Sequence, residues 1–392
     1  MKWFKVVLSG ALLAGTALLA GCWDKKELNE VAVVIGVGVD KGEDGEFSLT
    51  AQVIKPPAQK QGGGGSGGAE LPTWSVNAQG KTIMDAVTEL NRISPRRLYW
   101  PHLQIIIFGE ALAKDGIAPT ITWFERDRDS RSSTFVAVTR GTAEDLLNQK
   151  IELGNVPAKA MSDLIGNAQI RQLPARQMTM RQLTEILSTP GVDAALDIID
   201  PKEIRGKVET YVMAGAALLR GDRLVGYVTD EAVHGIGMAN NVYKNASIVV
   251  ACPNDENAYV TFQVTDFERT LQVKARGGRV QATFDMFVEG NVIDQTCAEE
   301  LLTPEKREEV EKLIADKMDW ELVSMFKQAA EAGSDVYGIG RELRRHDPRA
   351  WRALRDGWHE RLKYAVDVRT KIDANIRRAG LVVDPTIRKM ED

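Results

Sequence analysis

Apolar and polar positions along the first half of the chain predict strands and helices in turn. Residues 31–40 and 47–54 are rich in β-branched side chains and flank a polar, glycine-containing stretch, which predicts a β-hairpin. Further strands are expected over residues 73–78, 103–108 and 134–139, and helices over 82–93, from 110 and from 142. Strands that alternate with helices favour an α/β or α+β arrangement, a mixed fold, for this half.

The second half begins with strands. Six are expected, over residues 211–219, 223–228, 246–252, 259–264, 270–275 and 280–288. Gly277-Gly278 predicts a hairpin turn before the last of them. Strands that follow one another so closely predict an antiparallel sheet.

Helices close the second half. Thr303 as N-cap and Pro304 in the first turn predict the start of a helix that Gly333 ends. Asp347-Pro348 predicts the start of a second helix. The apolar side of this helix is expected to carry Trp351, Leu354, Trp358 and Leu362. A sheet followed by long helices is typical of an α+β fold.

Breaks in the pattern predict the domain organisation. Thr189-Pro190-Gly191 and Asp200-Pro201-Lys202 interrupt it. We therefore expect an N-terminal mixed α/β domain over residues 23–200 and a C-terminal α+β domain over residues 206–388, each a sheet with packed helices. One of the two halves can divide further, which would give three domains. Residues 56–69 are dominated by glycine and predict a flexible loop.

The first 22 residues predict a targeting signal. Two lysines, Lys2 and Lys5, precede an uncharged apolar run over residues 6–20, as in a secretory signal peptide. Residues 19–21 (Leu-Ala-Gly) lead into Cys22 and resemble the lipobox of bacterial lipoproteins. This resemblance implies cleavage after residue 21, a diacylglyceryl thioether on Cys22 and acylation or a free amine at the new N-terminus. An ordinary signal peptide, or a membrane anchor that ends in cysteine, is the alternative.

Composition narrows the class of protein. The chain has 392 residues, 44% hydrophobic, which is enough apolar content to build cores and excludes global disorder. Lys and Arg number 50 against 55 Asp and Glu, a net charge of −5, so we expect no nucleic-acid partner. Lipidation of Cys22 would leave Cys252 and Cys297 as a pair outside the cytoplasm, where a disulfide can form. Two separate thiols kept apart by the sheet are the alternative.

No motif for catalysis, cofactor or metal binding is complete. Residues 64–68 formally match the G-x-S-x-G nucleophile elbow but lack the strand before it and the helix after it. The alternating charges of residues 127–131 predict a solvated loop or helix end. We expect no metal site, because the histidines are scattered. They are His102, His234, His346 and His359.

A basic run lies near the C-terminus. It is expected on the face of its helix opposite Trp351 and Trp358. Its members are Arg341, Arg344, Arg345, His346, Arg349, Arg352 and Arg355. A plain polar helix face is one interpretation, and contact with anionic lipid or an acidic partner surface is the other.

Short motifs follow one another from Cys22 almost to the end of the chain. They are Cys22-Trp23-Asp24-x-x-Glu27-Leu28-Asn29-Glu30, Val34-Ile35-Gly36-Val37-Gly38-Val39-Asp40, Gly80-Lys81-Thr82-Ile83-x-x-Ala86, Arg96-Arg97-Leu98-Tyr99, His102-Leu103, Gly109-Glu110-x-Leu112-Ala113, Phe124-x-Arg126-Asp127, Asp335-x-Tyr337-Gly338-Ile339-Gly340, Pro348-x-x-Trp351 and Ile376-Arg377-Arg378-x-Gly380-Leu381. This series resembles the Ger(x)C family, the C subunits of bacterial spore nutrient germinant receptors. The main departure is the glycine run within residues 56–69, which is longer than the family pattern.

The resemblance implies a non-enzymatic lipoprotein subunit needed for the response of spores to nutrients that triggers germination. Its implied partners are an A subunit with membrane-spanning segments and a B subunit resembling amino-acid permeases. Its implied place is the outer face of the inner spore membrane, and its implied fold is three mixed α/β domains. The alternative function is a solute-binding lipoprotein of an importer, which would need two lobes around a ligand cleft. A lipid-anchored hydrolase is a third and weaker hypothesis.

Overall fold

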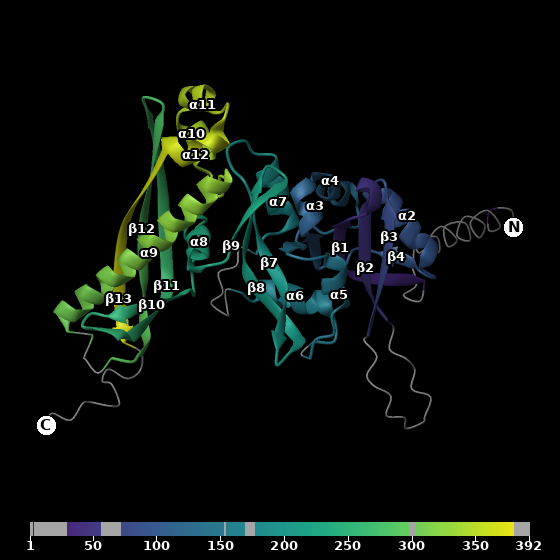
Figure 1. Ribbon diagram of the computed structural model, residues 1–392, viewed down its shortest axis with the longest axis horizontal. Coiled ribbons are helices and arrows are strands. Elements are labelled where there is room, and N and C mark those ends of the chain that lie inside the picture. Colours follow the sequence, from purple (N-terminus) through teal and green to yellow (C-terminus); the bar gives the residue numbers. More distant parts are fainter. Residues whose placement is uncertain are drawn as a thin grey trace.

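Two β-sheets, placed one after the other along the long axis of the molecule, organise the chain (Figure 1). The computed structural model describes residue 3 and residues 30–55, 72–152, 154–168, 177–297, 301 and 303–379. The mixed fold expected for both halves is present: each sheet packs against helices.

The large sheet has nine strands in the order β3-β2-β1-β5-β6-β7-β8-β9, with β4 paired to β1. The strands are β1 (Val31–Lys41), β2 (Phe47–Ile54), β3 (Thr73–Gly80), β4 (Arg97–Tyr99), β5 (Ile105–Gly109), β6 (Phe135–Thr139), β7 (Ala195–Ile204), β8 (Lys207–Arg220) and β9 (Arg223–Val228). The predicted hairpin is confirmed as the antiparallel pair β1–β2. At the centre, β1, β5, β6 and β7 run parallel to one another.

Helices cover both faces of the large sheet, and β5 shows why. Its sequence, Ile-Ile-Ile-Phe-Gly, is buried throughout, as expected for a parallel strand enclosed on both sides. Ile105 and Ile107 pack with α5 (Ala143–Asn148) and α6 (Pro157–Gly166). Ile106 and Phe108 point the other way, because side chains alternate along a strand. They meet α2 (Ile83–Ile93), α3 (Glu110–Asp115), α4 (Ala118–Arg126) and α7 (Met180–Leu187).

The small sheet has the order β10-β11-β12-β13. Its strands are β10 (Ser247–Cys252), β11 (Asp255–Arg276), β12 (Arg279–Gln295) and β13 (Val366–Ala379). The predicted turn at Gly277-Gly278 is confirmed: both residues have positive φ and join β11 to β12. The helix that begins at Pro304 is α9 (Pro304–Ala332), whose buried side includes Val310, Ile314 and Met318. Beside it lies the short α8 (His234–Ala239).

Three expectations for the second half are corrected by the structure. The first concerns the strands expected at residues 211–219 and 223–228. They belong to the large sheet, as parts of β8 and β9, and the change from one sheet to the other comes after Val228. The boundary expected at residues 200–206 falls inside the β7–β8 hairpin. Pro201 is tolerated in β7 because it lies on the exposed outer part of that strand.

The second correction concerns the direction of the strands in the small sheet. The sheet is not wholly antiparallel, because β13 returns after the helices and runs parallel to β12. The segments expected at 259–264 and 270–275 are one continuous strand, β11. The third correction is a break in the second helix. Gly357, with φ of 73°, divides it into α11 (Pro348–Leu354) and α12 (Trp358–Ala365), which follow α10 (Ile339–His346).

Candidate functional site at the junction of the two sheets

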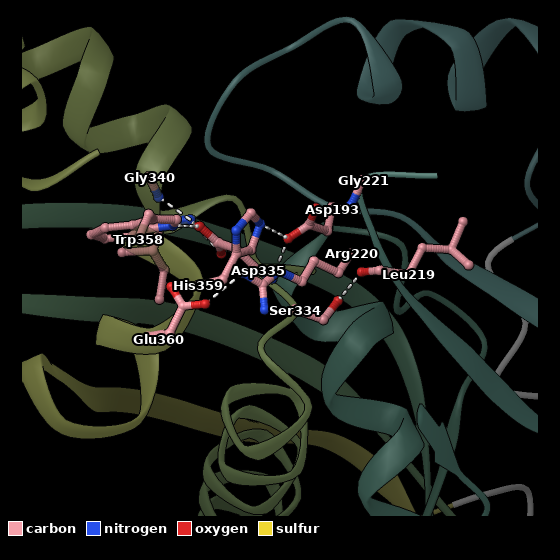
Figure 2. A network of polar contacts seen from close by, with 11 residues as sticks. Asp193, Leu219, Arg220, Gly221, Ser334, Asp335, Gly340, Trp358, His359 and Glu360 are labelled. Carbon is pink, nitrogen blue, oxygen red and sulfur yellow. Dashed lines mark hydrogen bonds and ion pairs between the residues drawn. The ribbon is translucent and has the colours of Figure 1, made fainter. Parts of the chain in front are cut away.

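The two halves of the molecule meet at a junction of buried polar contacts (Figure 2). From the large sheet come the loop before β7, which includes Gly191 and Asp193, and the turn after β8. From the other half come the segment between α9 and α10 and the first turn of α12. Residues more than a hundred positions apart in sequence are therefore brought into contact.

Asp335 is buried at the centre of the junction and holds the first turn of α10. Its Oδ1 accepts the backbone N–H of Ile339 at 2.9 Å. Its Oδ2 accepts the N–H of Gly340 at 2.8 Å and Nε1–H of Trp358 at 2.9 Å. Burial raises the pKa of the Asp335 carboxyl to about 6; nearby Asp193 adds to this rise, and the three donors oppose it.

Asp193 links the halves through a reciprocal pair of hydrogen bonds. Its backbone N–H donates to the Asp335 carbonyl at 2.9 Å, and the N–H of Asp335 donates to Asp193 Oδ2 at 2.8 Å. The same Oδ2 lies 3.0 Å from Nε2 of His359, and Oδ1 accepts the N–H of Gly221 at 2.8 Å. One side chain thereby fixes the end of β8, the segment after α9 and the start of α12.

Two further contacts cross the edge of the junction. Ser334 Oγ donates to the Leu219 carbonyl on β8, and the Arg220 guanidinium pairs with Glu360 at 2.6 Å. Exposed ion pairs contribute little to stability, whereas leaving a buried polar group unpaired is costly. The buried hydrogen bonds of Asp193, Ser334 and Asp335 therefore matter more than this exposed ion pair. They lie beside a hydrophobic cluster that also joins the halves, in which Leu218 and Val228 pack with residues of the second half.

Two glycines allow the backbones of the halves to touch. Arg341 N–H donates to the Gly191 carbonyl at 2.6 Å. A Cβ on Gly191, whose φ is +81°, would lie 2.5 Å from the carbonyl carbon of Gly340. A Cβ on Gly340 would lie 2.8 Å from each of the rings of Trp351 and Trp358. Side chains at these positions would separate the halves.

The polar groups of the junction have a structural role: they connect the two halves. Each oxygen of the two carboxylates already accepts a hydrogen bond or contacts His359, so these groups are engaged in holding backbone. The arrangement couples the position of the large sheet to that of α10–α12.

A groove of about 770 Å³ lies over the junction. Pro190 and Gly191 line it from the large-sheet half, and α10–α12 line it from the other half. Three arginines of the predicted basic run, Arg344, Arg352 and Arg355, line it together with Trp351, Trp358 and His359. The arginines are exposed and the two indoles are buried. The expectation that the charges lie opposite the tryptophans is thus corrected for these three, which share one groove with the indole rings.

Positive charge is concentrated around this groove. Residues 339–365 carry eight Lys or Arg and four Asp or Glu, although the whole chain is negative. Arg355 lies 3.5 Å from Asp356, and Arg352 Nε donates to the Pro348 carbonyl. Arg344 has no acidic partner in the part of the chain that the structure describes. The groove can therefore receive an anionic group.

The cysteines expected to pair are joined in the structure. Sγ of Cys252 and Sγ of Cys297 are 2.09 Å apart and their Cα atoms 6.4 Å apart. The disulfide links the end of β10 to the residues after β12. Cys22 and the loop over residues 56–69 lie outside the described residues, so both remain predictions. Within the described ranges no helix has both the length and the apolar content needed to cross a bilayer.

The four histidines are dispersed, as the sequence suggests. His102 is exposed, with its ring 5.9 Å from that of Tyr99. His234 contacts Glu321 at 3.1 Å and His346 contacts Glu342 at 3.4 Å, while His359 belongs to the junction. Among the residues described, no three His, Cys, Asp or Glu side chains are grouped so as to hold a metal ion.

Two protein-family models together match most of the chain. "Spore germination protein N-terminal domain" matches residues 24–201, and "Spore germination B3/GerAC like, C-terminal" matches residues 214–380. The chain belongs to the Ger(x)C family. The two Ger(x)C models adjoin between residues 201 and 214, near the boundary expected from the sequence, whereas the sheets change after Val228.

Known Ger(x)C relatives extend over nearly the whole chain. Spore germination protein KC of Bacillus subtilis (strain 168) is 24% identical over 99% of this chain and 99% of its own length. Spore germination protein A3 of the same organism is 24% identical over 93% of this chain and 95% of its own. The crystal structure of the GerBC protein covers 90% of this chain and 100% of that chain, with a TM-score of 0.53 and 16% identity, which shows a shared fold.

One Ger(x)C motif forms the core of the junction. In Asp335-x-Tyr337-Gly338-Ile339-Gly340, the aspartate binds both later N–H groups, and Tyr337 OH donates to the Leu322 carbonyl at 2.7 Å. Sequence reasoning identifies this motif but misses Asp193 and the role of His359. The nearby signal, Thr189-Pro190-Gly191, predicts only a break, because the residue it contacts is more than a hundred positions away.

Proposed function

We propose that this chain is a non-enzymatic lipoprotein subunit of a spore nutrient germinant receptor. The observation that carries the proposal is the match of both halves, in order and at nearly full length, to spore germination proteins. Relatives of this kind favour a receptor role over the solute-binding alternative. The lack of a complete catalytic motif in the sequence supports action through binding to other proteins.

The proposed location follows from the N-terminus. Cys22 would carry the diacylglyceryl and N-acyl groups that anchor the chain on the outer face of the inner spore membrane. Two or more acyl chains give stable attachment where one is marginal. The receptor's A and B subunits are the proposed partners, and both are membrane proteins in the family pattern.

The basic groove is the proposed contact surface for those partners. Guanidinium groups form two parallel hydrogen bonds to a carboxylate, so Arg344 and Arg352 suit an acidic segment of a partner subunit. Such a segment would touch both halves at once, because Pro190 and Gly191 form the opposite wall. A partner bound there would contact residues of the junction directly, because Gly191, Trp358 and His359 line the groove.

Deletion and complementation test the receptor role. Spores that lack the gene are expected to form in normal numbers and keep their heat resistance, but to lose the fall in optical density that follows at least one nutrient. The wild-type gene should restore this response. Cys22→Ala should fail to restore it and should leave the membrane fraction, because the acyl chains supply the membrane affinity. Normal nutrient responses in the deletion strain, with slower nutrient uptake by growing cells, would instead favour the importer.

Charge reversal tests the groove. The double variant Arg344→Glu and Arg352→Glu should fold normally, since both side chains are exposed, and should weaken the response and the co-purification of the partner subunits. Lys274→Glu with Lys312→Glu is the matched control, because these lysines are exposed and lie away from the groove lining. Equal co-purification with both doubles would remove the groove from the proposal, and reduced binding to anionic vesicles alone would identify a lipid contact.

A further inference from the structure

A second cavity lies in the large-sheet half, away from the junction. It encloses about 210 Å³ between α4, the start of α7 and the loop over residues 130–134. Its floor is apolar and buried, made by Leu103, Ile106, Phe124 and Met180. An apolar floor with a few polar groups converging on it is the usual composition of a small-molecule site.

Charged side chains of both signs line the rim. Glu125 extends from α4, Arg131 from the loop and Arg181 from α7, and all three are exposed. None of the three forms an ion pair within the described part of the chain, unlike many exposed charges of this protein, such as Lys114 with Glu110. One carboxylate and two guanidiniums thus border the same small cavity without neutralising one another.

A hydroxyl without a partner lies in the wall. Thr184 Oγ1 is buried and has no hydrogen-bond partner. Its neighbours in the lining are satisfied: Thr134 Oγ1 donates to the Leu103 carbonyl, and Ser130 Oγ donates to Asp127. A buried hydroxyl left unpaired costs about 1–3 kcal/mol, so the wall retains one polar group that a ligand can satisfy.

Backbone hydrogen bonds tie together the segments that line the cavity. The N–H groups of Met180 and Arg181 donate to the carbonyls of Thr134 and Ser132, which ties the loop to α7. Within the loop, the N–H of Thr134 donates to the Arg131 carbonyl. The cavity also adjoins Phe124-x-Arg126-Asp127, a family motif that the junction does not use: Phe124 forms the floor and Asp127 holds Ser130.

We propose that this cavity binds a small zwitterion that carries an apolar group. The ligand's carboxylate would pair with Arg131 and Arg181, its ammonium group with Glu125, and its apolar group would lie on the floor at Ile106 and Phe124. An α-amino acid with an aliphatic side chain has this chemistry and suits the volume. The binding itself does not depend on the proposed receptor function; only its meaning, direct contact between this subunit and a small ligand, rests on it.

Ligand analogues test the class of ligand. Equilibrium dialysis of the full-length lipoprotein in detergent should show saturable binding of leucine. Two analogues each lack one charge: 4-methylpentanoate has no amine, and 3-methylbutylamine has no carboxylate. Each should bind about tenfold more weakly, the loss expected for about 1.4 kcal/mol. Equal binding of 4-methylpentanoate and leucine would overturn the zwitterion class, and the absence of saturable binding of all three below about 10 mM would overturn the site.

Variants on the rim test the location. Arg181→Ala and Glu125→Gln should each weaken leucine binding about tenfold or more, whereas Arg128→Ala, an exposed arginine outside the lining, should not. All three substitutions are at exposed positions, so circular dichroism should show unchanged folding. Leucine binding that persists in both rim variants would place the site elsewhere. Failure of the receptor proposal would appear separately, as normal germination of the deletion strain, and would leave the binding result intact.

Discussion

The two halves of this molecule build their cores differently. Helices enclose the large sheet on both faces, so strands such as β5 are buried throughout. The small sheet has helices on one side, and its strands alternate buried with exposed residues; Val249 of β10, for example, is 50% exposed. The first half thus has a core on both faces of its sheet, whereas the second half has a core on one face of its sheet, together with a disulfide and a long helix.

The largest effect should come from breaking the disulfide. A closed loop with a sequence separation of 45 restricts the unfolded chain by roughly 4 kcal/mol in the chain-entropy model. Cys252→Ser with Cys297→Ser should therefore destabilise the small-sheet half strongly and raise its hydrogen exchange, with less change in the large sheet. Intact-mass measurement after alkylation under non-reducing, unfolding conditions checks the bond itself. Two thiols that alkylate fully would show that the bond is absent and the comparison wrong on this point.

The next effect should come from the two-sided core. Ile107→Ala in β5 removes a fully buried side chain and should lower the free energy of unfolding by about 2–5 kcal/mol. Val249→Ala in β10 removes a half-exposed one and should change it by no more than about 0.5 kcal/mol. Urea denaturation measures both. Similar losses at the two positions would mean that something covers the outer face of β10.

A smaller effect is expected where the halves meet. Gly340→Ala places a Cβ 2.8 Å from two indole rings and 2.9 Å from Gly191, so we expect a loss of about 1–3 kcal/mol and weaker coupling between the halves. Gly141→Ala is the control, because a Cβ there meets nothing within 4 Å. The measurement is thermal unfolding followed by calorimetry, in which separated halves should give two transitions. A single transition at the wild-type temperature would contradict the claim that close packing at Gly340 holds the two halves together.

The junction should also make stability depend on pH. Because the folded pKa of Asp335 is about 6, above its unfolded value, the folded state holds the proton more tightly. Its contribution to stability is therefore present below about pH 4 and is lost as pH rises to about 6, on the order of 2–3 kcal/mol. Asp335→Asn lacks this titration, so its free energy of unfolding relative to wild type should improve over that interval. A difference that is flat from pH 4 to 7 would argue against the raised pKa.

The smallest effect is expected from the glycine-rich loop. Residues 60–69 contain no large apolar side chain, so we expect their deletion to remove no apolar burial. Loop-closure entropy changes slowly with length, and the melting temperature should shift by no more than a few degrees. A larger fall would show that this segment packs against the rest of the chain.

Local signals in the sequence predict much of the fold. The helices expected from residues 82 and 142 are present as α2 and α5. Thr82 and Thr142 are their N-caps and accept the N–H groups of Asp85 and Asp145. Strands whose formation depends on a partner strand distant in the sequence are not predicted by local signals. Strand β13 carries Asp367, Arg369 and Lys371 among its apolar residues, and charges of this density do not predict a strand before its partner is known.

The candidate sites are harder to predict from the sequence than the fold is. Asp193 and Asp335 meet across 142 positions, and nothing local to either residue indicates the other. The cavity proposed to bind a zwitterion is lined by α4, α7 and the loop over residues 130–134. These segments are separated in the sequence, so the sequence alone does not show that their side chains line one cavity. The basic run could be recognised from sequence, but not that Pro190 and Gly191 form the far wall of its groove.

The position of β13 in the chain has a consequence for biosynthesis. Since β13 pairs in parallel with β12 and is separated from it by all of α9–α12, the small sheet stays incomplete until β13 itself has been synthesised. Until then the edge of β12 that later pairs with β13 has unpaired N–H and C=O groups, which readily pair with other chains. A truncation after residue 365 would therefore yield a protein that keeps its first half and aggregates through its second.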